Sequence, residues 1–576
     1  MVQFWPGTDR SVKGSSRSRA RLLPPRGPLW QHQPFVEVPG VAMDGRFGEF
    51  VRDHVAVRQP LETGAALAWW EAATTGEAEA YRRGAALQTR IESLLADRGN
   101  FEFLRDLKQS GALGDPLQHR LLEVLYLSHL GRQCSEELLG EIVRLSTDLE
   151  ERFATFRAEL DGDRLSQNDI EHALAHSTDP ARRRAVWESS KSIGPAIAAD
   201  VRRLVHLRNR AARDLGFDDY YRMSLSLAEQ SPTEVEALFD DLEKHTREPY
   251  RNVKEDLDRE LAASFAIEPD ALRPWHYSDP FLQEVPLPTA LRLDDLLEER
   301  DLLRIASSYF EGIGLDVAGI LDRSDVHERE GKNQHAFCID IDREGDVRAL
   351  LNLSPTLRWM STALHELGHG VYDLGIRRDL PYPVRCPSHT FVTEGVAMFF
   401  GRLPYTSAWL ERMGLTGSRD PGELRRGLRS HQVRRQLVFS RWCQVVVRFE
   451  RALYADPDGP LQDRWWELVE RYQGVRRPED RSGEDWATKI HIVSAPVYYH
   501  NYAIGEMFAS QLHRAVLEHL GDPKGDEGSL VNDLAVGRFL EERVFAPGAS
   551  LPWPLHVEKA TGVPLSVTDF VDQYAG

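Results

Sequence analysis

The pentapeptide His365-Glu366-Leu367-Gly368-His369 constrains the fold of this chain more than any other feature, because its polar side chains converge only on a helix. Two histidines four residues apart lie on one helical face, where both imidazoles can bind one metal ion. The glutamate after the first histidine points about a quarter turn away and can reach a water on that metal. HExxH on a helix is typical of zinc hydrolases.

The residues around this motif favour a helix. Residues 361–364 are helix-compatible and mostly small, and residues 371–374 continue the helical run. Leu364 and Leu367 fit the apolar side of a buried helix. We therefore predict a metal-binding helix, and the alternative is a pair of surface histidines on an ordinary helix.

A catalytic zinc site needs three protein ligands and an open position for water. Glu394 lies 25 residues after His369 in the apolar run 391–400, where a carboxylate is costly unless it is paired or metal-bound. Cys386 and His389 are further candidates, but they fall in a proline-containing loop, where a rigid ligand is less expected. We predict Glu394 as the third ligand, and the alternative is an acid at a helix terminus or in a salt bridge.

Long amphipathic stretches follow one another along the chain and predict a mainly α protein. Apolar residues recur over 335–342 before a turn at 343–346, which predicts one small antiparallel sheet. No clear boundary interrupts residues 43–576, so we predict a single domain there. The stretches are 85–110, 116–131, 134–161, 197–215, 232–263, 293–313, 422–454, 501–521 and 530–543.

Residues 1–42 differ from the rest of the chain. They are rich in Arg, Ser and Pro, and they lack the apolar core that a secretory signal needs. We predict either a disordered extension or a start codon assigned too far upstream, with true translation beginning at Met43.

Charge and cysteine content restrict the partners and the compartment. The formal net charge of −19, from 71 basic and 90 acidic residues, argues against nucleic acid as a partner. No apolar run is long enough to span a bilayer, so no membrane partner is expected. The four cysteines have no paired spacing, and without a signal peptide this predicts a reducing cytoplasm. Nothing in the sequence predicts an oligomeric state.

Three further segments carry a resemblance to a known family. They are 335–340 with Asp346 and Arg348 after it, 465–474, and the stretch from Lys489 through the tyrosines to His513. In this order and spacing, and together with the HExxH motif and Glu394, they resemble the angiotensin-converting-enzyme family of zinc peptidyl-dipeptidases. The thimet oligopeptidase and oligoendopeptidase F families share the motif, the distant glutamate and the C-terminal tyrosines, and they are the rival families.

The resemblance implies a fold. It predicts a single large, nearly all-helical ellipsoid of two lobes around a deep active-site channel, with zinc on the channel floor. The strand at 335–340 would line this channel and pair with the backbone of a bound peptide.

The resemblance also assigns residues that bind the substrate. His335 and Ala336 match positions that hold the peptide near the scissile bond. Lys489 matches a residue that binds the C-terminal carboxylate, and Tyr499 matches its neighbour in this carboxylate clamp. From its chemistry alone, Lys489 would be a surface lysine.

Two residues match the pair that stabilises the tetrahedral intermediate, His491 and Tyr502. A tyrosine hydroxyl that points at a developing oxyanion is a plausible electrostatic device. Without the resemblance, residues 497–502 would be an aromatic helix start packed against the core.

The chain departs from the family in several places. Asn501 and Val469 stand where animal members carry chloride-binding arginines, so chloride activation is not expected. The stretch 274–279 lacks the glutamine of the clamp, which predicts an incomplete clamp. Met398 replaces an acid that supports a zinc histidine in the family, and Asp373 is the predicted substitute.

These observations predict a zinc metallopeptidase with one Zn²⁺ per chain, held by His365, His369 and Glu394. Glu366 would take a proton from water as the general base and pass it to the leaving amine. The expected substrates are short peptides, with release of C-terminal dipeptides. The alternatives are a cytoplasmic endo-acting oligopeptidase of similar fold and a non-catalytic peptide-binding protein.

Overall fold

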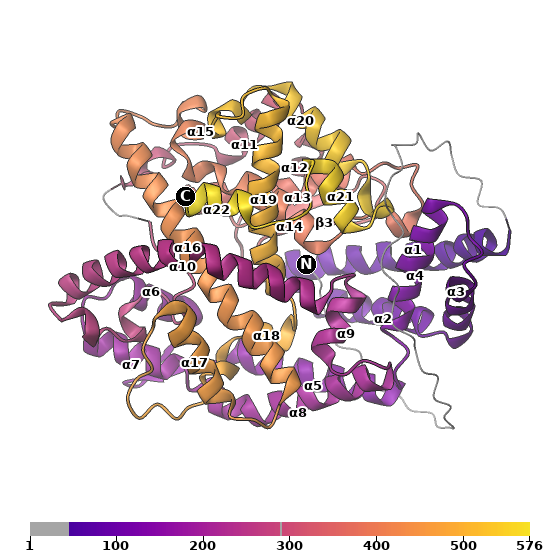
Figure 1. The fold of residues 1–576 in the computed structure, drawn as a ribbon, viewed down its shortest axis with the longest axis horizontal. Coiled ribbons are helices and arrows are strands. Elements are labelled where there is room, and N and C mark those ends of the chain that lie inside the picture. Colours follow the sequence, from indigo (N-terminus) through magenta and orange to yellow (C-terminus); the bar gives the residue numbers. More distant parts are fainter. Residues whose placement is uncertain (1–44, 288–290) are drawn as a thin grey trace.

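The computed structural model describes residues 45–287 and 291–576. Helices dominate this part of the chain, which confirms the predicted mainly α class (Figure 1). The prediction for residues 1–42 lies outside the described residues, and the two-lobed outline and the channel stay predictions. Within the described ranges, no helix combines the length and the apolar character that crossing a membrane requires.

The N-terminal half of the chain is a succession of helices, several of which begin at a polar capping residue. Asp97 caps α3 and so divides the predicted stretch 85–110 into two helices, and Ser231 caps α10, which has Pro232 at its first position. The helices are α1 (Arg46–Thr75), α2 (Ala78–Leu95), α3 (Arg98–Ser110), α4 (Pro116–Leu130), α5 (Glu136–Thr155), α6 (Gln167–His176), α7 (Pro180–Ser190), α8 (Ile193–Asp214), α9 (Tyr220–Leu227) and α10 (Pro232–Phe265).

The C-terminal half contains the HExxH motif and the predicted third ligand on two successive long helices. Thr356 caps the first of them and His389 caps the second, each through a side chain that accepts from a backbone N–H. The helices are α11 (Leu302–Gly312), α12 (Ala318–Arg323), α13 (Leu357–Gly375), α14 (Thr390–Gly401), α15 (Ser407–Arg412), α16 (Pro421–Ala455), α17 (Leu461–Gln473), α18 (His491–Ser494), α19 (His500–His519), α20 (Leu534–Leu540), α21 (Trp553–Thr561) and α22 (Thr568–Tyr574).

Two small antiparallel sheets are present in the described chain, so the prediction of one sheet was wrong. The predicted strand forms as β3 (Phe337–Asp340) and pairs with β4 (Val347–Leu350), with Phe337 opposite Leu350. The second sheet joins β1 (Ala158–Leu160) to β2 (Asp163–Leu165) through Asp161 and Gly162, both at positive φ. An Asp-Gly pair favours such a tight hairpin. The amphipathic pattern of α5 led us to extend the predicted helical stretch to residue 161, across β1.

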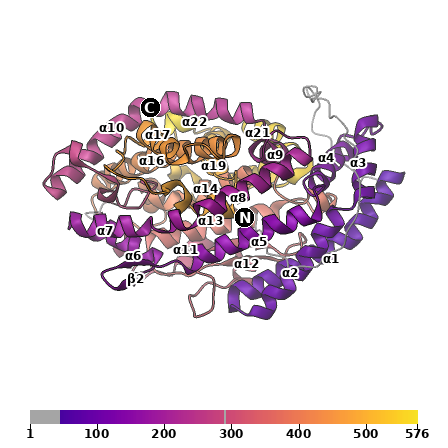
Figure 2. The same ribbon diagram turned by 90° about the horizontal axis from the view of Figure 1, so that it is seen from below.

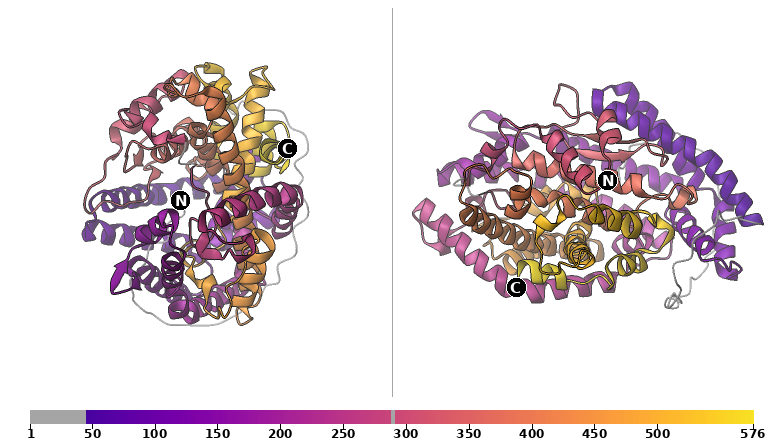
Figure 3. Two further views of the ribbon diagram at one scale, coloured as in Figure 1. Left: turned by 90° about the vertical axis from the view of Figure 1, so that its left-hand side faces the viewer. Right: turned by 90° about the horizontal axis from the view of Figure 1, so that it is seen from above.

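The long helices surround a central group of elements. In the views from below and from above, α10 lies along one long side and the α1–α2 hairpin lies toward the opposite side (Figures 2 and 3). Within the molecule α14 packs between α13 and α19, and β3 packs against α13. The HExxH helix is therefore covered by other elements and is not a surface helix.

Glycines allow the central helices to approach closely. A Cβ at Gly368, inside the HExxH motif, would lie 2.9 Å from Phe400 and 3.1 Å from Ala397 of α14. A Cβ at Gly395 would lie 2.9 Å from the carbonyl oxygen of Gly505 in α19. Contacts this short leave no room for larger side chains. Gly368 therefore sets the distance between the histidines on α13 and Glu394 on α14, and Gly395 sets the distance between α14 and α19.

Candidate metal centre and active site

Three side chains from two neighbouring helices form a metal-binding triad. The ligand atoms of His365 and His369 on α13 and of Glu394 on α14 all lie within 4.8 Å of one another. Oε2 of Glu394 lies 3.7 Å from Nε2 of His365 and 4.0 Å from Nε2 of His369. Ligand atoms about 2 Å from a tetrahedral zinc ion are about 3.3 Å apart, so small side-chain movements would fit the triad to zinc. Two imidazoles and one carboxylate are the donor set of a catalytic zinc site with one open position.

The two other ligand candidates have different partners. His389 caps α14 with Nδ1, which accepts from the N–H of Phe391, and its Nε2 lies 3.0 Å from the carbonyl oxygen of Ala228. The thiol of Cys386 faces the carbonyl oxygen of Pro383 at 3.8 Å. Both side chains are therefore engaged away from the triad, and Glu394 is the candidate that the structure brings to the histidines.

A threonine supports the second histidine. Nδ1 of His369 lies 2.7 Å from Oγ1 of Thr393, the residue before Glu394. The prediction that Asp373 takes this place was wrong, because α14 brings Thr393 directly to the ring. Asp373 lies beside Asp340 of β3, and burial together with the Asp340 carboxyl raises the pKa of its own carboxyl. This hydrogen bond at Nδ1 fixes the imidazole ring of His369, so that its Nε2 faces the other two members of the triad.

The predicted general base, Glu366, is buried beside the triad. Its residue surface is 8% exposed. Burial raises the pKa of its carboxyl most strongly, His365 lowers it, and the neighbouring carboxylate of Glu394 raises it again. The backbone of Cys338 in β3 also contacts this carboxyl and lowers its pKa. The predicted substrate strand and the predicted base are thus in direct contact.

Two tyrosines at the start of α19 lie close to Glu394, Tyr498 just before the helix and Tyr502 in its first turn. The hydroxyl of Tyr498 donates to Oε1 of Glu394 at 3.0 Å, a contact that sequence reasoning missed. The ring of Tyr502 lies 5.2 Å from that of Tyr498 and 6.4 Å from that of His491. Burial, followed by the charge of Lys489, lowers the pKa of His491 to about 3, so its ring is neutral near neutral pH.

Lys489, the predicted carboxylate-binding residue, contacts a glutamine. Its Nζ donates to Oε1 of Gln283 at 2.8 Å. Gln283 lies outside the stretch 274–279, so the structure brings to Lys489 a glutamine that the sequence comparison did not assign to the clamp. Lys489 also lies 5.5 Å from the ring centre of Tyr499, whose hydroxyl accepts from Nε1 of Trp442 at 2.7 Å. Burial lowers the pKa of Lys489 to about 8, although the carboxyls of Asp279 and Glu284 raise it.

The loop that carries Gln283 is held firmly. The carboxylate of Asp279 accepts from the backbone N–H groups of Phe281, Gln283 and Glu284 at 2.8–3.2 Å. Nε2 of Gln473 on α17 donates to the carbonyl oxygens of Phe281 and Leu282, both at 2.8 Å. Such a loop presents the amide of Gln283 in one orientation.

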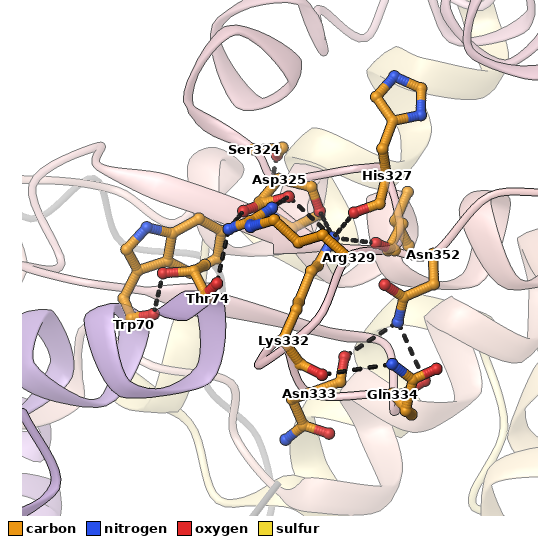
Figure 4. Close-up of polar contacts among 12 residues, drawn as sticks. Trp70, Thr74, Ser324, Asp325, His327, Arg329, Lys332, Asn333, Gln334 and Asn352 are labelled. Atoms are coloured by element: carbon orange, nitrogen blue, oxygen red, sulfur yellow. Dashed lines mark hydrogen bonds and ion pairs between the residues drawn. The ribbon is translucent and has the colours of Figure 1, made fainter. Parts of the chain in front are cut away.

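The predicted substrate segment precedes β3 and is pinned through its backbone. The side chain of His335 is exposed, and that of Ala336 is partly buried. The N–H of His335 donates to Oδ1 of Asn333 at 2.9 Å. Nδ2 of Asn352 donates to the carbonyl oxygens of Asn333 and Gln334 at 3.0 and 3.1 Å (Figure 4). The backbone before β3 is therefore ordered independently of a ligand.

A buried lysine ties this segment to its surroundings. The side chain of Lys332 is 0% exposed, and its ammonium donates to Oδ1 and the carbonyl oxygen of Asp325 at 2.8 and 3.0 Å (Figure 4). It also donates to the carbonyl oxygens of His327 and Leu351. The next residue, Asn333, donates its N–H to the carbonyl oxygen of Ala73 in α1 at 2.8 Å. The loop before β3 thus joins α1 to the end of β4.

Comparisons with known proteins agree with this geometry. Residues 294–574 match the model of the peptidase M2 family, angiotensin-converting enzyme. The angiotensin-converting enzyme of Theromyzon tessulatum is 22% identical over 305 residues, which are 50% of this chain and 49% of that protein. Those of Mesocricetus auratus and Sus scrofa are 23% and 24% identical over 69% of this chain.

The matches extend over only part of each relative. The aligned region spans about half of the Theromyzon tessulatum protein and 32% of each of the two mammalian proteins. The matched family region of this chain contains the triad, Glu366, Lys489 and the tyrosines at positions 498, 499 and 502. Gln283 lies outside it.

Proposed function

From the premise that this chain is an angiotensin-converting-enzyme-like metallopeptidase, we propose that it hydrolyses peptide bonds in short peptides with one zinc ion per chain. The observation that carries the proposal is the convergence of His365, His369 and Glu394, with Glu366 buried beside them. A non-catalytic peptide-binding protein needs no base at this position.

The residues of the site have separate tasks in this reaction. His365, His369 and Glu394 would hold zinc, which polarises a carbonyl group and lowers the pKa of a bound water. Glu366 takes the proton of the attacking water and passes it to the leaving amine. Tyr502 and the neutral ring of His491 donate to the oxygen on which negative charge develops.

The carboxylate clamp supports the release of C-terminal dipeptides. Lys489 provides a positive charge, its hydrogen-bond partner Gln283 is neutral and does not cancel that charge, and the ring of Tyr499 lies beside Lys489. A peptide whose C-terminal carboxylate binds there would be cut at a set distance from its end. An endo-acting oligopeptidase needs no such clamp and is the second candidate.

Amidation of the substrate tests the clamp. One peptide is prepared with a free and with an amidated C-terminus, and the products are identified by mass. We expect a large loss of kcat/KM on amidation and release of a dipeptide from the free form. Equal rates, with cuts at internal positions of both peptides, would instead establish an endo-acting oligopeptidase.

We also propose a reducing cytoplasm as the compartment. The support is that all four cysteines are free thiols without a disulfide. Fractionation of the source cells with an antibody against the chain tests this, and recovery outside the cytoplasm would overturn it.

A further inference from the structure

We propose that Tyr498 is a positioning residue for the metal centre, which holds the carboxylate of Glu394 so that one oxygen alone faces the histidines. The inference rests on the proposed function for the identity of the metal, zinc. It assigns a role to a residue that the resemblance left without one, since the resemblance gives roles only to Tyr499, just before α19, and to Tyr502, inside it.

The two oxygens of Glu394 have different neighbours. Oε1 accepts the hydrogen bond from Tyr498 at 3.0 Å. Oε2 is the oxygen that lies 3.7 and 4.0 Å from Nε2 of His365 and His369. A hydroxyl bonded to one oxygen fixes the rotation of the carboxylate about its last bond, so the other oxygen is presented to the metal. Bonds of this kind to ligating carboxylates affect metal affinity, typically by about 10–100-fold.

The residue before Tyr498 is held through its backbone. Val497 has a φ of 55°, a strained conformation for a β-branched residue, and its N–H donates to Oε1 of Glu450 at 2.8 Å. Glu450 lies on α16 and is 2% exposed. Such strain persists only where the surroundings impose it, so the turn before Tyr498 is set by the packing of α16.

The guanidinium of Arg208 fixes the start of the segment that leads to this turn. The guanidinium of Arg208 on α8 donates to the carbonyl oxygens of Ile492 and Val493, at 3.1 and 2.7 Å. The segment from Ile492 to Val497 is therefore attached to α8 at one end and to α16 at the other. The Tyr498 hydroxyl is presented by rigid elements rather than by a free loop.

The alternative role for Tyr498, donation to the substrate oxyanion, conflicts with its bond. A tyrosine hydroxyl has one proton, and in Tyr498 that proton is directed to a carboxylate. The hydroxyl of Tyr502 makes no hydrogen bond to the described residues, so its proton is available to a ligand. The two tyrosines therefore have different roles. Tyr498 orients Glu394, and Tyr502 donates to the oxyanion of the substrate.

Zinc affinity of the whole chain, measured by competition with a chromophoric chelator, tests the proposal. For Tyr498→Phe we expect the Kd for zinc to rise by about 10–100-fold. Tyr499→Phe and Tyr502→Phe remove the same atom from neighbouring tyrosines that make no hydrogen bond to Glu394, and they should bind zinc as the wild type does. Thermal unfolding of the metal-free proteins shows whether each variant is folded.

Two further variants make the result specific. 4-Aminophenylalanine at position 498 restores a donor on the same ring, and we expect it to return the Kd toward the wild-type value. In a Glu394→Ala background, Tyr498→Phe should change the Kd by less than about twofold, because its effect acts through Glu394.

Three results would overturn the proposal. They are an unchanged Kd in Tyr498→Phe, an equal rise in Tyr502→Phe, or a full effect of Tyr498→Phe that persists without Glu394. A wild-type protein that binds zinc but cleaves no peptide would refute the proposed function, and the affinity comparison would still decide the role of Tyr498.

Discussion

The ammonium of Lys489 donates a hydrogen bond of 2.8 Å to the side-chain oxygen of Gln283, although 206 positions separate the two residues in the sequence. A neutral amide satisfies one N–H of a buried lysine without cancelling its charge. The lysine therefore keeps a positive charge that a peptide carboxylate can compensate. This pair is the structural basis of the proposed preference for free C-termini.

Removal of the glutamine should weaken the binding of free C-termini. Gln283→Leu removes the side-chain amide Nε2, which can donate to the bound carboxylate while Oε1 accepts from Lys489, and a hydrogen bond to a charged group contributes about 1.5–3 kcal/mol. We therefore expect KM for a peptide with a free carboxylate to rise by about 10–100-fold, in steady-state assays. The amidated peptide is the control, because it makes no use of the clamp. An equal rise for both peptides would contradict the assignment.

The protonation of Lys489 should appear in the pH profile. Burial lowers its pKa to about 8, so the ammonium is present below pH 8 and is lost as the pH rises above it. The kcat/KM of the free peptide, divided by that of the amidated peptide, should therefore fall above pH 8. Asp279, Glu284 and the Cys443 thiol raise this pKa, and their effects are included in the value.

The ratio of the two kcat/KM values reports on the clamp alone, because changes at the metal centre affect the free and the amidated peptide equally. In Lys489→Met, the ratio should be low and independent of pH from 6.5 to 9.5. A ratio that still falls in this variant would assign the pH dependence to another group.

Glu366→Gln should separate metal binding from catalysis. The amide cannot accept the proton of water, and loss of a general base typically costs about 10²–10⁴-fold in rate. We expect a full zinc content, by atomic absorption, with kcat reduced by at least that range. Activity close to that of the wild type would show that the proposed mechanism is wrong.

His365→Ala should lose both zinc and activity, because it removes one of three ligands. Zinc content and hydrolysis measured on the same preparation check this. His389→Ala is a matched control, since its imidazole caps α14 and lies outside the triad. That variant should keep zinc and lose only about 0.5–2 kcal/mol of stability, the usual contribution of an N-cap. Loss of zinc in His389→Ala would contradict the assignment of His365, His369 and Glu394 as the three ligands.

Lys332→Met should destabilise the chain, because it leaves the acceptors around a fully buried ammonium without a donor. Unsatisfied buried groups cost about 1–3 kcal/mol each, so urea unfolding should show a loss of at least this size. Arg329→Met is the control, since Arg329 pairs with the same Asp325 but its side chain is 46% exposed. Equal effects of the two substitutions would show that burial of Lys332 is not decisive.

Local patterns were sufficient to predict the helical class and the centre of the site. The spacing of His365, Glu366 and His369 has a chemical meaning on a helix, and the structure places all three on α13. Glu394 could be selected because a carboxylate in an apolar helix needs a strong partner, and the structure places it against the histidines. Both inferences used only neighbours along the chain.

Contacts between distant segments were decided by the tertiary structure alone. Gln283 reaches Lys489, Tyr498 reaches Glu394, and Thr393 rather than Asp373 reaches His369. The β1–β2 hairpin was concealed by the helical pattern before it. Side-chain hydrogen bonds form only within about 3.5 Å, and the packing of whole helices sets distances on that scale. The amino-acid sequence by itself therefore indicated which side chains could bind a metal and act as a base, and the packed fold decided which side chains support them.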